Sequence, residues 1–237
     1  NIPCIWVATN HYVLKRIKNS KIYSNKNHSI SVIYFSTENC KYKFIVKENA
    51  RKKLKINSKK VILLFGCSDF SDPRKGFDVI NKVLEKLNNS KYDLEKILLV
   101  SFGETNKFIV NNGKIEWVHL GTINSSKEMN LVYRAADVML SPSLDDLGPT
   151  TVQEAFLNDL YIISFELGLA CDLIIDNYNG NIIKNFDEGK FYNAICKKIN
   201  NIHKMKTNNQ KIKKINLTKG LCSGKSEAQN FLLKINQ

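Results

Sequence analysis

Residues 61–77 read VILLFGCSDFSDPRKGF, and the fold class can be inferred from the pattern of this stretch. Its first five residues are all apolar, which predicts a strand buried on both faces, as in the interior of a parallel sheet. Gly66 then permits a sharp turn, and from residue 77 onward apolar residues recur at helical spacing. A buried strand, a short turn and a helix form the repeating unit of an α/β fold.

The same alternation of short apolar runs and longer helical patterns continues through most of the chain. Further strands are expected at 5–8, 30–35, 97–100, 115–120, 138–140, 161–165 and 181–183. Helices are expected at 11–18, 47–54, 77–87, 126–135, 150–157, 169–174 and 188–199. This order predicts a parallel sheet with helices on both faces. Such sheets bind ligands beyond the carboxyl ends of their strands, so the strand-to-helix turns are the places to search for a site.

The chain of 237 residues has a formal net charge of +14, and its basic residues are densest at 197–219. The charge leaves open a nucleic acid, an anionic membrane face, a phosphate-bearing small substrate, or simply a solvated Lys-rich surface. No aromatic RNA-binding pattern or zinc-finger spacing accompanies it, so nucleic acid is not expected. The six cysteines form no C-x-x-C pair, which favours a reducing cytoplasm. We expect a cytoplasmic protein, with peripheral contact at the inner membrane face left open.

The turn after residue 65 carries a pair of cations, Arg74 and Lys75, where the next helix begins. Two cations beside the positive end of a helix repel each other unless an anion lies between them. A diphosphate suits this place, with Arg as a fork and Lys as a point charge. The alternative is that both cations pair with Asp69 and Asp72 and only cap the helix.

A second turn lies in residues 141–155, which read SPSLDDLGPTTVQEA. Its Gly-Pro pair prepares a helix start, where the N–H groups and hydroxyls of Thr150 and Thr151 can hold phosphate oxygens. Glu154 follows one turn inside the helix, within reach of ribose hydroxyls, whereas Asp146 lies on the loop before it. The alternative is that Asp146 is an N-terminal helix charge and Glu154 part of a capping arrangement.

Together the turns resemble those of the large retaining glycosyltransferase family 4, also called glycosyl transferases group 1. Its hallmark is two acidic residues eight positions apart and followed by Ala, here Asp146 and Glu154. The basic pair before a Gly, the Leu-Gly-Thr of 120–122, the YRAADV of 133–138 and the DLIIDNYNG of 172–180 also match. The family is typified by sucrose, mannosyl and lipopolysaccharide transferases.

The resemblance implies a GT-B fold of two facing Rossmann-like domains. Residues 1–45 would be the remnant of the acceptor-side domain, and 46–200 the nucleotide-sugar-binding domain. Residues 201–237 would hold the basic stretch and a C-terminal helix, at about 228–235, that crosses back towards the N-terminal part.

The same resemblance implies a bacterial capsule or lipopolysaccharide sugar transferase, with a nucleoside diphosphate sugar and a glycan or lipid-linked acceptor as partners. Neither an obligatory metal nor a cofactor is implied. Catalytic roles are implied for Arg74, Lys75, Asp146 and Glu154. Substrate-binding roles are implied for Gly66, Gly121, Thr122, Gly148, Pro149, Thr150 and Thr151. The two cations would neutralise the leaving diphosphate.

Three departures from the family pattern leave other functions open. Asp146 stands where most members have Glu, and Gly66–Cys67 where many have Gly-Arg. The bulk of the first domain, including its Gly-rich loop and catalytic His, has no counterpart in the sequence, and the chain's four histidines match no such catalytic position. His119 is expected to be an ordinary core or rim residue. We therefore expect little sugar transfer by this chain alone. A nucleotide-binding module and, less favoured by the acidic spacing, a sugar-nucleotide epimerase are the alternatives.

Overall fold

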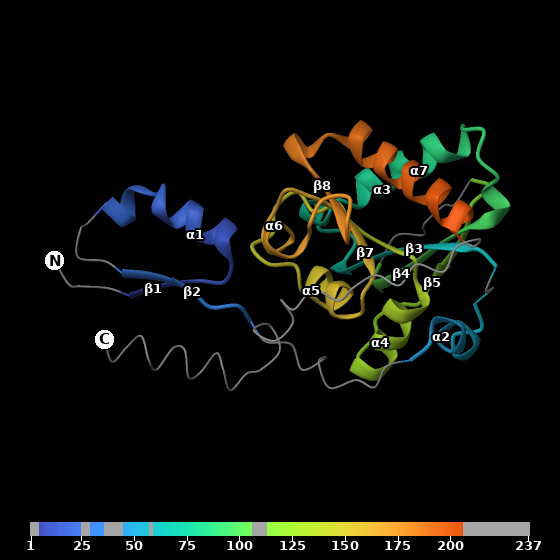
Figure 1. Cartoon of the computed structure of the whole chain (residues 1–237), viewed down its shortest axis with the longest axis horizontal. Helices are drawn as coiled ribbons and strands as arrows, with labels where there is room; N and C mark the ends of the chain where they lie inside the picture. Colours follow the sequence, from blue (N-terminus) through green and yellow to red (C-terminus); the bar gives the residue numbers. More distant parts are fainter. Residues whose placement is uncertain (1–4, 25–28, 36–44, 57–58, 106–112, 206–237) are drawn as a thin grey trace.

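The computed structural model describes residues 5–24, 29–35, 45–56, 59–105 and 113–205. In Figure 1 a small N-terminal unit lies beside a larger α/β unit. The small unit consists of the parallel pair β1 (Ile5–Ala8) and β2 (Ser29–Val32), with α1 (His11–Lys18) and the turn η1 (Lys21–Ser24). The expected final helix lies outside the described residues. No helix in the described part is both long and apolar enough to cross a membrane.

The larger unit is built on a sheet of six parallel strands in the order β5-β4-β3-β6-β7-β8. These strands are β3 (Val61–Asp69), β4 (Ile97–Glu104), β5 (Glu116–His119), β6 (Val138–Ser141), β7 (Tyr161–Phe165) and β8 (Gly180–Ile183). Short turns η4 (Leu94–Lys96) and η5 (Lys184–Phe186) precede β4 and follow β8. The α/β fold with a parallel sheet is as predicted.

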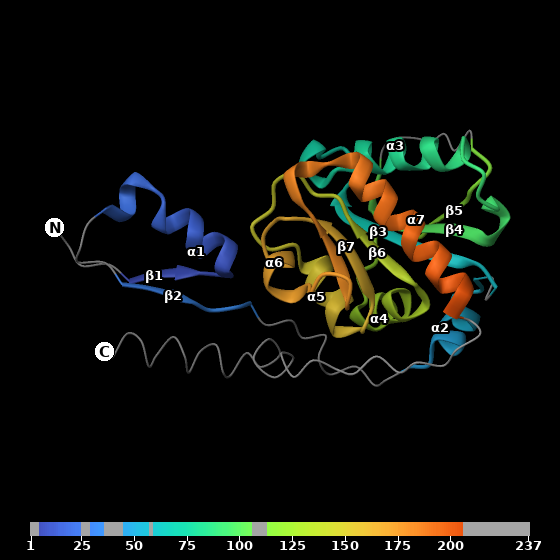
Figure 2. The same cartoon turned by 45° about the horizontal axis from the view of Figure 1, so that its top comes forward.

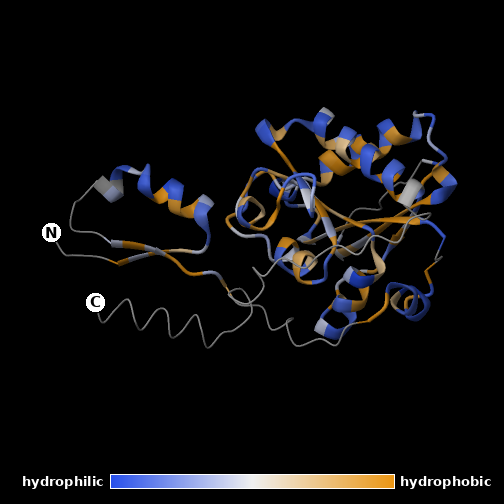
Figure 3. Cartoon of the chain, in the orientation of Figure 1, coloured by the Kyte–Doolittle hydropathy of each residue, from blue (hydrophilic) through white to orange (hydrophobic). Residues whose placement is uncertain are grey.

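Helices cover both faces of the sheet because the residues of β3 alternate between two cores. Val61, Leu63 and Phe65 pack under α3 (Phe77–Asn88) and α7 (Glu188–Met205). Ile62 and Leu64 pack under the opposite layer. That layer holds α4 (Ser126–Ala135), α5 (Thr150–Leu157) and α6 (Ala170–Leu173), with α2 (Lys47–Lys53) against α4. Figures 1 and 2 show the two layers, and Figure 3 shows the apolar strands between helices with polar outer surfaces.

The strand order reverses between β3 and β6, which pair directly although β4 and β5 lie between them in sequence. The chain after β3 enters α3 on one face, and the chain after β6 enters α5 on the other. At such a switch point the two connections diverge and leave a crevice outside the carboxyl ends of the strands. The turns after Asp69 and Ser141 therefore flank the place where a ligand is expected.

The predicted strand ends at residues 65 and 100 are wrong, because β3 runs to Asp69 and β4 to Glu104. Gly66 lies inside the strand and makes no sharp turn. It pairs with Phe102, and a Cβ atom at Gly66 would overlap the Phe102 ring. A glycine is therefore required here by the close approach of the ring. Helix α7 also extends past the predicted end at residue 199, and Ile202 in its added turn packs on the core.

Asp137, at the start of β6, ties α2 to the sheet. Its carboxylate accepts from Arg51 Nη2 at 2.6 Å, from Lys47 Nζ at 2.7 Å and from the Ile62 N–H at 2.8 Å. Arg51 is buried and also donates to the Ala135 carbonyl at 2.8 Å. Burial alone would raise the pKa of Asp137, but Lys47 and Arg51 outweigh it and the pKa is lowered. The carboxylate is therefore ionised and held by two cations.

We predict that Asp137→Asn lowers the free energy of unfolding by about 3 kcal/mol or more, because it leaves the buried Arg51 guanidinium without its counter-charge. Since the pKa of Asp137 is lowered in the folded chain, its stabilisation is complete above the ordinary carboxyl pKa of about 4 and is lost as the pH falls through the lower pKa of the folded state. Urea denaturation at several pH values measures both effects.

The matched control is Asp159→Asn. Asp159 is exposed, pairs with Arg134 at 3.5 Å and has a φ of 57°, which Asn tolerates. Its replacement should change the free energy of unfolding by about 0.5 kcal/mol or less. Equal losses in the two variants would contradict the assignment of Asp137 as a structural anchor.

Candidate functional site

Two turns meet at the carboxyl ends of β3 and β6. The turn after β3 includes η3 (Pro73–Lys75), and the turn after β6 spans residues 142–149. The Leu144 N–H donates to the Arg74 carbonyl at 2.7 Å. Gly76, with a φ of 73°, lies against Pro142 so closely that a Cβ atom would overlap the Pro142 carbonyl. The two turns therefore form one structural unit.

An ion pair between Lys75 and Asp146 joins the two turns through side chains. Lys75 Nζ lies 2.7 Å from Asp146 Oδ2, and the two side chains are only 23% and 14% exposed. The other oxygen, Oδ1, accepts from the Gly148 N–H at 3.0 Å. Asp146 thus fixes both a cation and the backbone that leads into α5. Within the described part of the chain, the Asp146 carboxylate contacts its own loop and Lys75 and not the first turn of α5, so the alternative that it serves as a charge at the helix N-terminus does not hold.

Arg74 is held more loosely, by Asp72 of its own turn. The distances from Asp72 are 2.7 Å to Nη2, 3.1 Å to Nε and 3.0 Å to the Arg74 backbone N. These hydrogen bonds lower the pKa of Asp72 and raise that of Arg74. Arg74 is 62% exposed, and such surface pairs are weak and easily exchanged. Pairing within the turn was the alternative to a ligand site, and it holds for Arg74 with Asp72 but not for Lys75.

Both cations lie in η3, before α3, and not in the first turn of α3 as expected. Asp69 accepts from Ser71, at 2.7 Å from both the Ser71 N and Oγ atoms. The αL conformation of Gly76 separates η3 from α3. Arg74 and Lys75 therefore project from a short turn of their own.

Glu154 lies on α5 and is held by Tyr133 of α4. The Tyr133 hydroxyl donates to Glu154 Oε2 at 2.8 Å. Tyr133 is fully buried, and burial, with the nearby Glu154 carboxylate, raises its pKa. Thr150 and Thr151 form the first turn of the same helix, after Pro149. Tyr133 is the first residue of the YRAADV stretch, but the sequence pattern did not indicate it as a partner of Glu154.

Gly121 and Thr122 follow β5, the edge strand, and lie farther along the same edge of the sheet. Gly121 has a φ of 67°, and no atom lies within 4 Å of where its Cβ would be. His119, just before it, is held by Ser101 Oγ, 2.9 Å from its Nδ1, and stands edge-on to Phe70. These contacts are those of a rim residue, as expected for His119.

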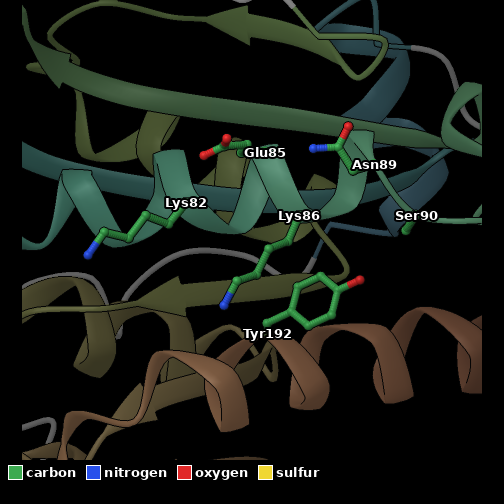
Figure 4. Close-up of a pocket in the computed structure, with 6 residues that line it drawn as sticks. All are labelled: Lys82, Glu85, Lys86, Asn89, Ser90 and Tyr192. Atoms are coloured by element: carbon green, nitrogen blue, oxygen red, sulfur yellow. The ribbon is translucent and has the colours of Figure 1, made fainter.

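The structure therefore brings Arg74, Lys75, Asp146 and Gly148 together, with Thr150, Thr151 and Glu154 on the adjoining helix. Gly66 stands apart, inside β3 against Phe102. A separate shallow groove lies between α3 and α7 (Figure 4). It is lined by Lys82, Glu85, Lys86, Asn89, Ser90 and Tyr192. It lies along the helices that cover one face of the sheet and not at the strand ends.

Residues 46–215 match the model of the family described as "Glycosyl transferases group 1". No curated protein sequence matches the chain. Among solved structures, a sucrose-phosphate synthase from Thermosynechococcus elongatus superposes with a TM-score of 0.71 and 16% identity, over 100% of this chain and 58% of that one. This chain thus spans 58% of the synthase.

Two further structures were solved with ligands. HepE from Anabaena, in complex with UDP and glucose, has a TM-score of 0.69 and 14% identity, over 98% of this chain and 62% of that one. The pneumococcal O-GlcNAc transferase GtfA, in complex with UDP and GlcNAc, has a TM-score of 0.66 and 16% identity, over 98% and 44%. At these identities the likeness shows the fold, which is of the GT-B type.

Gly76 and Gly121 offer a test of the contact between the two turns. Both have a left-handed φ, but only Gly76 lies against another turn. We predict that Gly76→Ala lowers the free energy of unfolding by about 3 kcal/mol, from backbone strain plus overlap with Pro142. Gly121→Ala carries the strain alone and should cost about 1 kcal/mol. Chemical denaturation compares them, and equal losses would mean that the two turns are not packed as described.

Proposed function

The chain belongs to the glycosyl transferases group 1 family, and from this premise we propose that it binds a nucleoside diphosphate sugar for transfer to a glycan or lipid-linked acceptor. We further propose that transfer proceeds with retention at the anomeric carbon, as in family 4, and serves a bacterial capsule or lipopolysaccharide. Residues 46–200 would hold the donor, and 1–45 would lie on the acceptor side. The observation that carries the proposal is the pair of cations at the switch point, one of which is bound to Asp146 on the loop that leads into α5.

The reaction breaks the bond between the sugar and the diphosphate, and negative charge develops on the leaving oxygen. Cations already in place stabilise that charge without reorganisation. Arg74 is itself exposed and can exchange its Asp72 partner for phosphate oxygens, while Lys75 is kept in place by Asp146. Thr150 and Thr151 would hold phosphate oxygens at the helix start, and Glu154, fixed by Tyr133, would accept from the ribose hydroxyls.

The distribution of charge supports an acceptor that is anionic or is carried on an anionic membrane face. Residues 46–200 contain 21 Lys and Arg against 20 Asp and Glu and are nearly neutral. Residues 1–45 contain seven Lys and Arg and one acidic residue, and residues 201–237 contain eight and one. The excess therefore lies outside the donor part. A phosphate-bearing lipid carrier at a membrane face would complement it.

A second candidate is a nucleotide-binding module that needs a separate acceptor domain. The described part of the N-terminal unit has two strands and one short helix, which is too little to enclose an acceptor and exclude water. A transferase turns over nucleotide sugar with a lipid-linked acceptor, whereas a module binds the nucleotide without turnover. An assay with both substrates distinguishes the two.

We predict that Lys75→Ala weakens binding of a nucleoside diphosphate by about 10-fold or more, because a charge-assisted contact in a half-buried place is lost. Isothermal titration calorimetry with UDP, GDP and ADP measures it. Lys82→Ala is the control, since Lys82 lies on α3 and pairs with Glu188. It should leave the affinity unchanged. Unchanged binding in Lys75→Ala would remove this lysine from the site.

We predict that Glu154→Gln weakens binding of UDP more than binding of inorganic pyrophosphate. A carboxylate oxygen accepts from a ribose hydroxyl, whereas Gln has one acceptor and places a donor at the other position. Pyrophosphate has no ribose and serves as the internal control. Equal losses of affinity for the two ligands would show that Glu154 acts by holding the fold.

A further inference from the structure

Asn10, in the small N-terminal unit, contacts the loop that carries Asp146. Its side chain is 1% exposed. Its Oδ1 accepts from the Val13 N–H at 2.9 Å and so caps α1, while its Nδ2 donates to the Leu147 carbonyl. The two neighbours fix the orientation of the amide, because one is a donor and the other an acceptor. Asn is suited to this position since it offers both functions on a short side chain.

The Leu147 carbonyl is linked to the cation site by few bonds. It belongs to the peptide whose nitrogen, on Gly148, donates to Asp146 Oδ1 at 3.0 Å. Asp146 in turn holds Lys75 at 2.7 Å. The Asn10 amide nitrogen is also only 3.6 Å from the Cβ position of Gly148. Asn10 thus binds the carbonyl of the Leu147–Gly148 peptide, and the N–H of the same peptide orients Asp146, the partner of Lys75.

Other contacts keep the N-terminal unit in place beside this loop. Gln153, buried on α5, donates to the Phe35 carbonyl at 2.7 Å. Asp172 of α6 accepts from the His11 N–H and the Tyr34 hydroxyl, both at 2.9 Å. Asn10 is therefore held against the loop by the whole unit and not by its own hydrogen bond alone.

We propose that Asn10 is a positioning residue, through which the N-terminal unit sets the 145–149 loop and thereby Lys75 for the diphosphate. The inference rests on the proposed function, since it takes the diphosphate as the ligand of Lys75. The buried side-chain amide of Asn10 thereby links the acceptor-side unit to the loop that orients Lys75. Donor affinity then depends on a residue that touches no part of the nucleotide.

The test is a double-mutant cycle between Asn10→Ser and Lys75→Ala, with UDP, GDP and ADP as probes in calorimetry. Ser still caps α1 but is too short to reach the Leu147 carbonyl. We expect Asn10→Ser to weaken binding about 3- to 10-fold in the otherwise native chain. In the Lys75→Ala background it should weaken binding less than about 2-fold, since Asn10 affects the diphosphate only through the position of Lys75.

Two further variants complete the test, one as a second disruption of the contact and one as a control. Asn10→Asp keeps the cap and removes the donor, so it should also weaken binding if Asn10→Ser proves too unstable to measure. Arg16→Ala removes an exposed pair with Asp145 at 3.9 Å, between the same two segments, and should change affinity less than about 2-fold.

Equal losses from Asn10→Ser with and without Lys75 would overturn the positioning role, because a purely structural defect adds to the loss of Lys75. Unchanged binding in both Asn10 variants would overturn it as well, and would leave the proposed function standing. A native chain that binds none of the three nucleotides would overturn the proposed function and this inference with it.

Discussion

The reversal of strand order between β3 and β6 is the constraint on which the rest of the site depends. Because these two strands pair in the middle of the sheet, the chain leaves one towards α3 and the other towards α5, on opposite faces. At such a switch point, ligands of parallel α/β sheets bind in the space outside the carboxyl ends of the two strands. The groups that flank this space come from residues about 70 positions apart in sequence, and the backbone contact between Leu144 and Arg74 holds them together.

The charges at these strand ends come from two ion pairs that differ in their surroundings. Both cations of the β3 turn have a carboxylate partner, but the two pairs differ in exposure. Arg74 and Asp72 form a local, exposed pair that an anion can displace at little cost. Lys75 and Asp146 form a half-buried pair between two turns, so that breaking it would leave charges poorly solvated. Arg74 can therefore change its partner when a ligand binds, whereas Lys75 stays at a fixed position while its ion pair holds the two turns together.

Local pattern predicted much of this fold. The helices at 11–18, 126–135 and 150–157 have the predicted bounds, because each shows one apolar face and a clear start. The strand ends of β3 and β4 were missed, since they depend on the pairing of Gly66 with the bulky Phe102 and not on either run by itself.

The partners of the predicted site residues could not be predicted either, because they also depend on contacts between distant parts of the chain. Tyr133 and Glu154 are 21 positions apart, and Asn10 and Leu147 are 137 apart. Neither contact follows from spacing along one helix or strand. The net charge of the whole chain did not reveal where the charge lies, because residues 46–200 are almost neutral and the excess lies in residues 1–45 and 201–237.

We propose that a nucleoside diphosphate binds at the carboxyl ends of β3 and β6. A crystal structure of the chain with UDP, or with whichever nucleoside diphosphate binds most tightly, tests it most directly. We expect diphosphate oxygens in contact with Arg74 and Lys75 and with the backbone N–H groups at the start of α5, and the ribose beside Glu154. A nucleotide found in the groove between α3 and α7, or one whose phosphates contact neither cation, would contradict it.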